Sequence, residues 1–188
     1  MKKSRAETQA ECEKNSLQES HWAYQGKVIQ LRLDTYNLDG KTKVFEIIHH
    51  PGAVVIIPID PKGRLLLVRQ WRRAIGQITL ELPAGTLEDR EDPADCAQRE
   101  LQEETGFRAK TMTPLRGFFS APGFCDEYLH LFLAEDLVPS PLPPDDDEGI
   151  DLVTVEIPEA LKWIEEHKIK DAKSIAGILR FALMEKHG

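Results

Sequence analysis

The sequence has few cysteines, no excess of positive charge and no long apolar run, and each absence narrows the classes of protein it fits. Its three cysteines, Cys12, Cys96 and Cys125, are widely spaced and form no CxxC or Cys/His pattern of a zinc site. They are typical of reduced thiols in a cytoplasmic protein. The net charge of −8 argues against a general nucleic-acid binder, which needs a basic surface to displace counterions from phosphates.

No stretch approaches the roughly 18 consecutive apolar residues of a membrane-spanning helix, and the first residues are too polar for a signal peptide. We therefore expect a protein that neither spans a membrane nor is secreted by that route. Its 188 residues, 41% of them hydrophobic and 30% charged, are enough for one domain with a substantial core, or for one domain with a small appendage.

The N-terminal part predicts a polar tail followed by a small antiparallel sheet. Residues 1–20 lack hydrophobic periodicity, so we expect a frayed, flexible tail with some helix, and regular structure from about His21. Residues 27–38 and 41–50 are two extended stretches. They are joined by Asp39-Gly40, which suits the φ > 0 positions of a hairpin turn. The sequence thus predicts a sheet within residues 21–50.

The rest of the chain predicts further strands and then helices. Residues 53–59 and 64–71 are apolar runs separated by the turn signal Asp60-Pro61-Lys62-Gly63, and we expect them to form a buried hairpin. Strands are also predicted at 78–82, 115–121, 127–137 and 151–157, with helices at 93–105, 158–167 and 174–186. Strands followed by packed helices favour an α+β fold built as an α/β/α sandwich.

The helix at 93–105 carries the most informative side chains. Glu100, Glu103 and Glu104 stand at i, i+3 and i+4, so they share one helix face. Three clustered carboxylates repel one another and call for cations, and hard oxygen ligands suit Mg²⁺ or Mn²⁺. The alternative interpretation, without a metal site, is a solvated helix face with i,i+4 ion pairs.

The spacing around these glutamates decides between the two interpretations. The segment GTLEDREDPADCAQRELQEETGF, residues 85–107, matches G-x5-E-x7-R-E-U-x-E-E-x-G-U at every specified position, where U is a bulky apolar residue. This segment resembles the Nudix box of the Nudix hydrolase superfamily. The resemblance covers residues 22–181 and implies the Nudix fold with a mixed central sheet. With the flexible tail expected at 1–20, it implies two further regions: a small antiparallel β subdomain at 21–50 that mediates dimerisation, and a Nudix hydrolase domain at 51–188.

The resemblance also implies roles for residues of the box. Glu100 and Glu104 are expected to bind metal directly, Glu103 to bind or orient a shared ligand, and the carbonyl oxygen of Ala84 to contribute one more ligand. A glycine at position 85 lets the backbone come close to the metal. Arg99 lies four residues before Glu103 and within reach of Glu91 if the loop folds back. We expect it to orient carboxylates in catalysis rather than to contact substrate.

The catalytic base is expected outside the box. A pyrophosphate bridge is hydrolysed by in-line attack of water while metal ions hold the nonbridging oxygens. In one branch of the family the base is often an acid on a mobile loop. We predict that Glu148 is this base and also contacts metal, with Asp146 or a glutamate of the box as the alternative. The competing interpretation is that this acidic run is a solvated linker.

Outside the box, the sequence resembles the ADP-ribose pyrophosphatase branch. The resemblance rests on RQWR at 69–72, ELPAG at 81–85 and SAPGF at 120–124, where the branch usually reads Ser-Pro-Gly without the alanine. Arg69 and Arg72 are expected to clamp the diphosphate, since guanidinium groups suit phosphate oxygens, although they are otherwise surface charges at a strand end. By resemblance, Glu81 accepts hydrogen bonds from the base or sugar, and Pro122 belongs to the substrate-binding loop.

The expected activity is Mg²⁺-dependent hydrolysis of the pyrophosphate bond of ADP-ribose or a related nucleoside diphosphate sugar. The expected partners are this small molecule and a second subunit in a cytoplasmic homodimer, with no nucleic acid and no membrane. Adenine is expected near interface aromatics, and Trp22, Tyr24 and Tyr36 are candidates that ordinary packing explains as well. Two alternatives stay open. One is a Nudix pyrophosphatase for GDP-mannose, dinucleoside polyphosphates or damaged nucleotides, and the other is a non-catalytic regulator that binds a nucleotide sugar.

Overall fold

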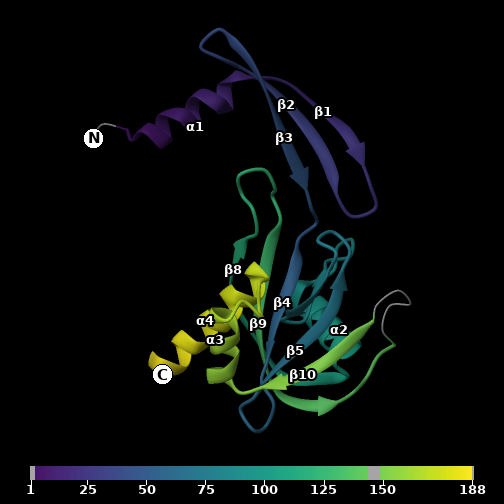
Figure 1. The fold of residues 1–188 in the computed structure, drawn as a ribbon. Coiled ribbons are helices and arrows are strands. Elements are labelled where there is room, and N and C mark those ends of the chain that lie inside the picture. The colour runs from purple at the N-terminus through teal and green to yellow at the C-terminus, as the bar shows by residue number, and fades with distance from the viewer. Residues whose placement is uncertain (1–2, 144–148, 188) are drawn as a thin grey trace. The chain divides into compact units, whose positions relative to one another are not determined.

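The computed structural model describes residues 3–143 and 149–187 and divides the chain into two compact units. The first unit comprises Met1–Pro51 together with Ala121–Glu127. The second comprises Gly52–Ser120 and Tyr128–Gly188. Figure 1 labels the elements of both units.

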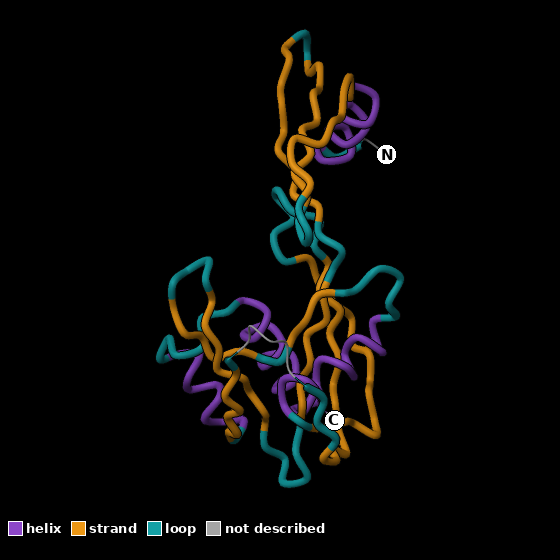
Figure 2. Tube along the Cα trace, turned by 90° about the vertical axis from the view of Figure 1, so that its right-hand side faces the viewer, coloured by secondary structure: helices purple, strands orange, loops and turns teal. Residues whose placement is uncertain are grey.

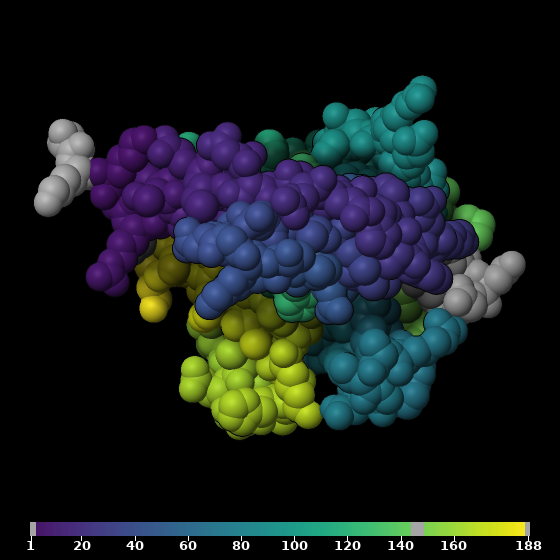
Figure 3. Space-filling view, turned by 90° about the horizontal axis from the view of Figure 1, so that it is seen from above, coloured from purple at the N-terminus to yellow at the C-terminus, as the bar shows by residue number. Residues whose placement is uncertain are grey.

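The first unit consists of helix α1 (Arg5–Ser16) and an antiparallel sheet in the order β1-β2-β3, formed by β1 (Leu17–Gln25), β2 (Gln30–Leu38) and β3 (Lys41–His49). Asp39 and Gly40 form the turn between β2 and β3 with φ values of 51° and 75°, which confirms the predicted hairpin. Figure 2 shows this turn as a teal segment joining two orange strands. In Figure 3 the purple to blue atoms of α1 and the three strands form one contiguous surface.

Regular structure begins earlier than the predicted His21, because residues 5–16 form a helix and residues 17–25 form a strand. Helix α1 starts in a capping box: Ser4 Oγ accepts from the Glu7 amide at 3.2 Å, and the Glu7 carboxylate accepts from the Ser4 amide at 2.7 Å. The Ser-x-x-Glu signal for this cap was present in the sequence. Strand β1 has no apolar alternation, and its ladder with β2 gives it regular structure.

The second unit contains two sheets. One has four strands in the order β7-β4-β9-β8, formed by β4 (Ala53–Pro58), β7 (Ala84–Thr86), β8 (Phe107–Phe119) and β9 (Tyr128–Pro139). The other has the order β10-β5-β6, formed by β5 (Leu65–Arg72), β6 (Gln77–Glu81) and β10 (Ile150–Val155). Strand β4 is parallel to β9 and antiparallel to β7, so the larger sheet is mixed.

The predicted hairpin of residues 53–59 and 64–71 is wrong, because β4 and β5 belong to different sheets. Between them the structure records only an isolated bridge, Ile59 to Leu65. Both edges of β4 are taken by β7 and β9, and both edges of β5 by β6 and β10. The turn signal at Asp60–Gly63 is real, but these long-range pairings decide which strands share a sheet.

Helices cover both faces of the strands, with α2 (Pro93–Thr105) on one side and α3 (Ile157–Glu165) and α4 (Ala172–His187) on the other (Figure 1). The buried strand β4 shows the reason. Val55 and Ile57 pack in one apolar cluster with Ala160 of α3 and Ile178 of α4. The alternate residues of β4 pack in a second cluster with α2. This arrangement is the α/β/α sandwich.

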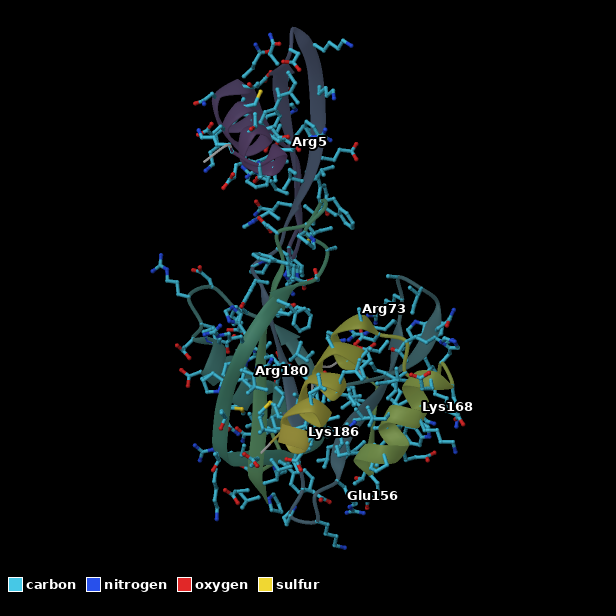
Figure 4. The ribbon with its side chains drawn as sticks, turned by 90° about the vertical axis from the view of Figure 1, so that its left-hand side faces the viewer. Arg5, Arg73, Glu156, Lys168, Arg180 and Lys186 are labelled. Carbon is cyan, nitrogen blue, oxygen red and sulfur yellow. The ribbon has the colours of Figure 1, made fainter. Side chains whose placement is uncertain are left out.

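The exposed charges of α4 lie away from this core. Arg180 and Lys186, labelled in Figure 4, are exposed, whereas Ile178 and Phe181 of the same helix are buried. No helix in the described part of the chain is long and apolar enough to cross a membrane.

Candidate active site

Helix α2 begins and ends where the sequence predicted. The Asp92 carboxylate accepts from the Ala94 amide at 2.8 Å, and Pro93 occupies the first turn. Gly106 ends the helix in the left-handed region, with φ of 76°, and its amide donates to the Gln102 carbonyl at 3.0 Å. Leu101 is fully buried, which fixes how the helix is turned against the sheet.

The Glu104 carboxylate joins this helix to strand β7. It accepts a hydrogen bond from the Ala84 amide at 3.0 Å, and Glu104 is only 8% exposed. The backbone at Ala84, whose carbonyl was predicted to bind metal, is therefore brought against a predicted carboxylate ligand. These two residues are twenty positions apart in the sequence.

Gly85 makes room for the next carboxylate. A Cβ atom built at this position would overlap the Glu100 carboxylate, so the side chain of Glu100 lies directly against the β7 backbone. A glycine is needed here for close approach rather than for an unusual φ. The structure thus brings Ala84, Gly85, Glu100 and Glu104 together.

Arg99 connects the remaining acids of the box. Its guanidinium donates to both Glu91 oxygens at 2.9 and 3.1 Å, and Nη1 donates to Glu100 at 2.7 Å and to Glu103 at 3.0 Å. The hydrogen bond from Arg99 is the main cause that lowers the pKa of Glu91 to about 2. Glu91 in turn raises the pKa of Arg99. Arg99 contacts carboxylates, as the sequence predicted.

The donor set fits a hard divalent cation. Among the described residues no group of three or more His, Cys, Asp and Glu side chains is already arranged to hold a metal ion. Glu100 and Glu103 instead bond the Arg99 guanidinium, and Glu100 also lies against the space left open by Gly85. Carboxylates and a backbone carbonyl are the ligands that Mg²⁺ and Mn²⁺ prefer. The residues present therefore suit such an ion.

A second cluster of charges is centred on Glu81, which is only 2% exposed. Arg72 donates to its two oxygens at 2.8 and 2.6 Å, Thr79 Oγ1 donates at 2.5 Å, and Lys173 Nζ also donates. Burial by itself raises the pKa of Glu81, but the Arg72 hydrogen bond, the charge of Lys173 and the other donors lower it to about 2. Glu81 thus holds Arg72 in this structure.

The first turn of α4 ties this cluster to the chain entering the box. Lys173 donates to Asp171 at 2.9 Å, and Ser174 Oγ donates to the same carboxylate at 2.5 Å. Ser174 Oγ also accepts from the Leu82 amide at 2.7 Å. Sequence reasoning missed these three residues. Lys173 and Ser174 lie 92 positions beyond Glu81 and Leu82, and only the packing of α4 brings them there.

The hydrogen bonds described above do not involve the other predicted substrate residues. Arg69 forms an exposed ion pair with Asp151 at 2.7 Å. Pro122 belongs to the segment Ala121–Glu127 of the first unit. Glu148 and Asp146 lie outside the described residues.

The aromatic candidates are in the first unit. Trp22 and Tyr24 are 41% and 58% exposed, and Trp22 lies 5.8 Å from the Arg32 guanidinium. The ring of Tyr36 meets that of Phe45 edge-on at 5.4 Å. The rings of Trp22 and Tyr24 are thus partly open to solvent.

Comparison with known proteins agrees with this geometry. The NUDIX domain model matches residues 49–178. An "ADP-ribose pyrophosphatase" of Bacillus subtilis is 39% identical over 86% of this chain and 89% of its own length. A "Methanol dehydrogenase activator" of Bacillus methanolicus is 38% identical over the same shares. A solved structure, "Crystal structure of ADP compounds hydrolase", is 21% identical, has a TM-score of 0.81 and covers 92% of this chain and 94% of that one.

The structural match extends the agreement from the box to the arrangement of strands and helices, and it confirms the Nudix fold that the sequence implied. The family model spans both the helix with Glu100 and Glu104 and the strands that pack against it. The chain belongs to the NUDIX domain family.

Proposed function

We propose that this protein hydrolyses the pyrophosphate bond of a nucleoside diphosphate sugar, with ADP-ribose as its preferred substrate, to a nucleoside monophosphate and a sugar phosphate. The observation that carries the proposal is the meeting of Glu104, Ala84, Gly85 and Glu100 between α2 and β7. The name of the Bacillus subtilis relative supports the choice of substrate.

The cofactor in this proposal is Mg²⁺, with Mn²⁺ as a substitute. Glu100, Glu104 and the Ala84 carbonyl would hold it, with Glu103 as a further ligand. Such an ion supplies charge neutralisation at the phosphate oxygens. Arg99 keeps the carboxylates oriented through its bonds to Glu91, Glu100 and Glu103.

In the proposed reaction a water oxygen attacks one phosphorus and the bond from that phosphorus to the bridging oxygen breaks. A carboxylate oxygen of Glu148 accepts the proton of the attacking water, with Asp146 as the alternative base. Arg72 contacts the diphosphate, and its hydrogen bonds to Glu81 set its direction beforehand. Arg69 and Pro122 are further proposed substrate contacts. Because the Glu81 carboxylate already bonds Arg72, a direct contact of Glu81 with the base or sugar is a weaker proposal than its role in orienting Arg72.

We also propose that the first unit pairs with the same unit of a second copy. All of β1 is exposed, and exposed apolar residues line the small sheet: Leu17, Trp22, Tyr24, Val44 and Phe45. In its described strands only Asp34 is buried, where Ser20 and Arg32 bond its carboxylate. A sheet this size without an apolar core gains stability from a covering surface. The proposed regions keep the boundaries at residues 21–50 and 51–188.

A cytoplasmic location completes the proposal. Cys12, Cys96 and Cys125 are free thiols. Burial raises the pKa of the Cys96 thiol, which makes that cysteine an unreactive part of the core. Free thiols are typical of a reducing compartment.

The test is a substrate panel with Mg²⁺: ADP-ribose, GDP-mannose, UDP-glucose, diadenosine polyphosphates and nucleoside triphosphates, with products identified and an EDTA control. The expected result is EDTA-sensitive release of AMP and ribose 5-phosphate from ADP-ribose, with Glu104→Gln reducing kcat roughly 100-fold or more. A preference for GDP-mannose would change the substrate but keep the mechanism. Metal and nucleotide binding without turnover of any compound would instead favour a regulator, which the name of the Bacillus methanolicus relative makes worth testing.

A further inference from the structure

Gln70, in the middle of β5, has a buried donor with no acceptor. Among residues 3–143 and 149–187, its Nε2 is the only buried side-chain nitrogen or oxygen without a hydrogen-bond partner, and the residue is 7% exposed. Buried polar groups are nearly always paired, because an unpaired group loses the hydrogen bonds it makes to water. The Gln70 amide is therefore an exception among the buried polar groups of the described residues.

Strand register places Gln70 in the Glu81 cluster. Gln70 pairs with Thr79 of β6 on one side and with Ile150 of β10 on the other. Because side chains alternate along a strand, Gln70 shares a face with Arg72 of β5 and with Thr79 and Glu81 of β6.

Arg72 and Glu81 stand on either side of this position in the ladder. In the ladder, Arg72 is opposite Gln77 and Glu81 is opposite Val68, so the Gln70–Thr79 pair lies midway between them. The two charged side chains nevertheless meet at 2.6 Å. The Gln70–Thr79 pair thus lies beside a guanidinium and a carboxylate that bond each other.

The Glu81 carboxylate on this face is already engaged as an acceptor. The Glu81 carboxylate accepts from Arg72, from Lys173 and from Thr79. Thr79 Oγ1 donates its proton to Glu81. An acceptor that enters the site would pair this amide, and the nearby cations Arg72 and Lys173 favour an anionic oxygen.

We propose that Nε2 of Gln70 donates a hydrogen bond to a nonbridging phosphate oxygen of the bound substrate, beside Arg72. This inference rests on the proposed function, since it takes the substrate to be a nucleoside diphosphate sugar. The amide adds a directed, uncharged donor to the charge of Arg72, whose side chain is 39% exposed and so reachable by a ligand. Gln70 is then a substrate-binding residue whose Nε2 is unpaired in the free protein and gains its acceptor in the complex.

The experiment compares Gln70→Leu with Gln102→Leu. In the free protein Gln70→Leu removes no donated hydrogen bond, so its Tm is expected to equal or exceed that of the wild type. Its Kd for ADP-ribose, measured calorimetrically in EDTA, and its KM with Mg²⁺ are expected to rise roughly three- to tenfold. Gln102 is the matched control, because its amide donates to Ser140 O at 2.9 Å and Oγ at 3.0 Å. Gln102→Leu is expected to lower Tm and leave Kd unchanged.

The same variants are titrated with ADP, which has the diphosphate but not the distal ribose. An equal fold loss for ADP and ADP-ribose supports a phosphate acceptor. A loss confined to ADP-ribose places the acceptor on the distal ribose and overturns the phosphate assignment. A lower Tm with unchanged Kd in Gln70→Leu also overturns the proposal, since the amide then serves the fold.

Failure of the proposed function gives a different pattern in the wild type. If the wild type binds GDP-mannose and not ADP-ribose, the comparison is made with GDP-mannose and GDP, and the same two outcomes decide on Gln70. If the wild type binds no nucleotide, the inference falls together with the proposed function.

Discussion

The Arg99 guanidinium holds the Glu91 carboxylate through two hydrogen bonds of 2.9 and 3.1 Å. This pair fastens the loop before α2 to the helix, because Glu91 also accepts from the Glu88 amide at 3.0 Å. The same guanidinium donates to Glu100 and Glu103. One side chain thus aligns the box loop with the carboxylate face of the helix.

Arg99→Lys is expected to lower kcat roughly 10- to 100-fold, because an ammonium group cannot bond Glu91 through two parallel donors and also reach both helix carboxylates. The half-saturating Mg²⁺ concentration is expected to rise as well. Both quantities are measured from initial rates against Mg²⁺. Arg90→Lys is the control, since the Arg90 side chain is 91% exposed. A normal Mg²⁺ dependence in Arg99→Lys would remove Arg99 from this role.

Gly85→Ala is expected to reduce kcat and weaken Mg²⁺ binding while leaving Tm nearly unchanged. The added Cβ displaces the flexible end of Glu100 rather than backbone. Gly63→Ala should show the opposite behaviour: Gly63 has φ of +77° with open space around it, so alanine there costs about 1 kcal/mol in stability and spares activity. Thermal melts and rate assays of both variants separate the effects, and full activity in Gly85→Ala would contradict the close approach.

The Glu81 carboxylate is expected to make stability depend on pH in the acid range. Its pKa is lowered from 4.5 to about 2, so its contribution is present above pH 4.5 and is lost as pH falls toward 2. The shift corresponds to on the order of 3 kcal/mol. Urea unfolding at several pH values should show that the difference in unfolding free energy between wild type and Glu81→Gln shrinks as pH falls through this window. A difference independent of pH would count against the ion pairs.

Ser174→Ala is expected to destabilise the fold by about 1–3 kcal/mol, because it leaves the buried Leu82 amide without its acceptor. Ser174 is fully buried, whereas Ser120 is exposed. Ser120→Ala is therefore the matched control, with a change within about 0.5 kcal/mol. Denaturant midpoints at constant m-value give the comparison, and equal midpoints for the two variants would show that water replaces the lost acceptor.

Glu148→Gln is expected to lower kcat roughly 100-fold or more at unchanged Tm, since it removes the proposed proton acceptor without altering side-chain size. Asp146→Asn is made in parallel, because it removes one negative charge from the same acidic segment, residues 145–148. Rates across pH distinguish them: the variant that loses the base also loses the acidic limb of the rate profile. If only Asp146→Asn is impaired, the role moves to Asp146.

The sequence by itself determined the local features. The box spacing, the Asp92 cap and the Gly106 stop located α2 to the residue, because caps and helical periodicity are written in neighbouring positions. The carboxylate face of Glu100, Glu103 and Glu104 also follows from helix geometry alone. The contact between Arg99 and Glu91 was within reach of sequence reasoning for the same reason.

Only the tertiary structure decided which distant segments meet. Apolar content predicted β4 and β5 as strands, but pairing with β9 and β10 placed them in two sheets. The hydrogen bonds from Lys173 to Glu81 and from the Leu82 amide to Ser174 had no local signal in the sequence, since the partners are 92 residues apart. The unpaired amide of Gln70 became visible only once every neighbour's hydrogen bonds were known, because satisfaction of a buried donor is a property of the packed site.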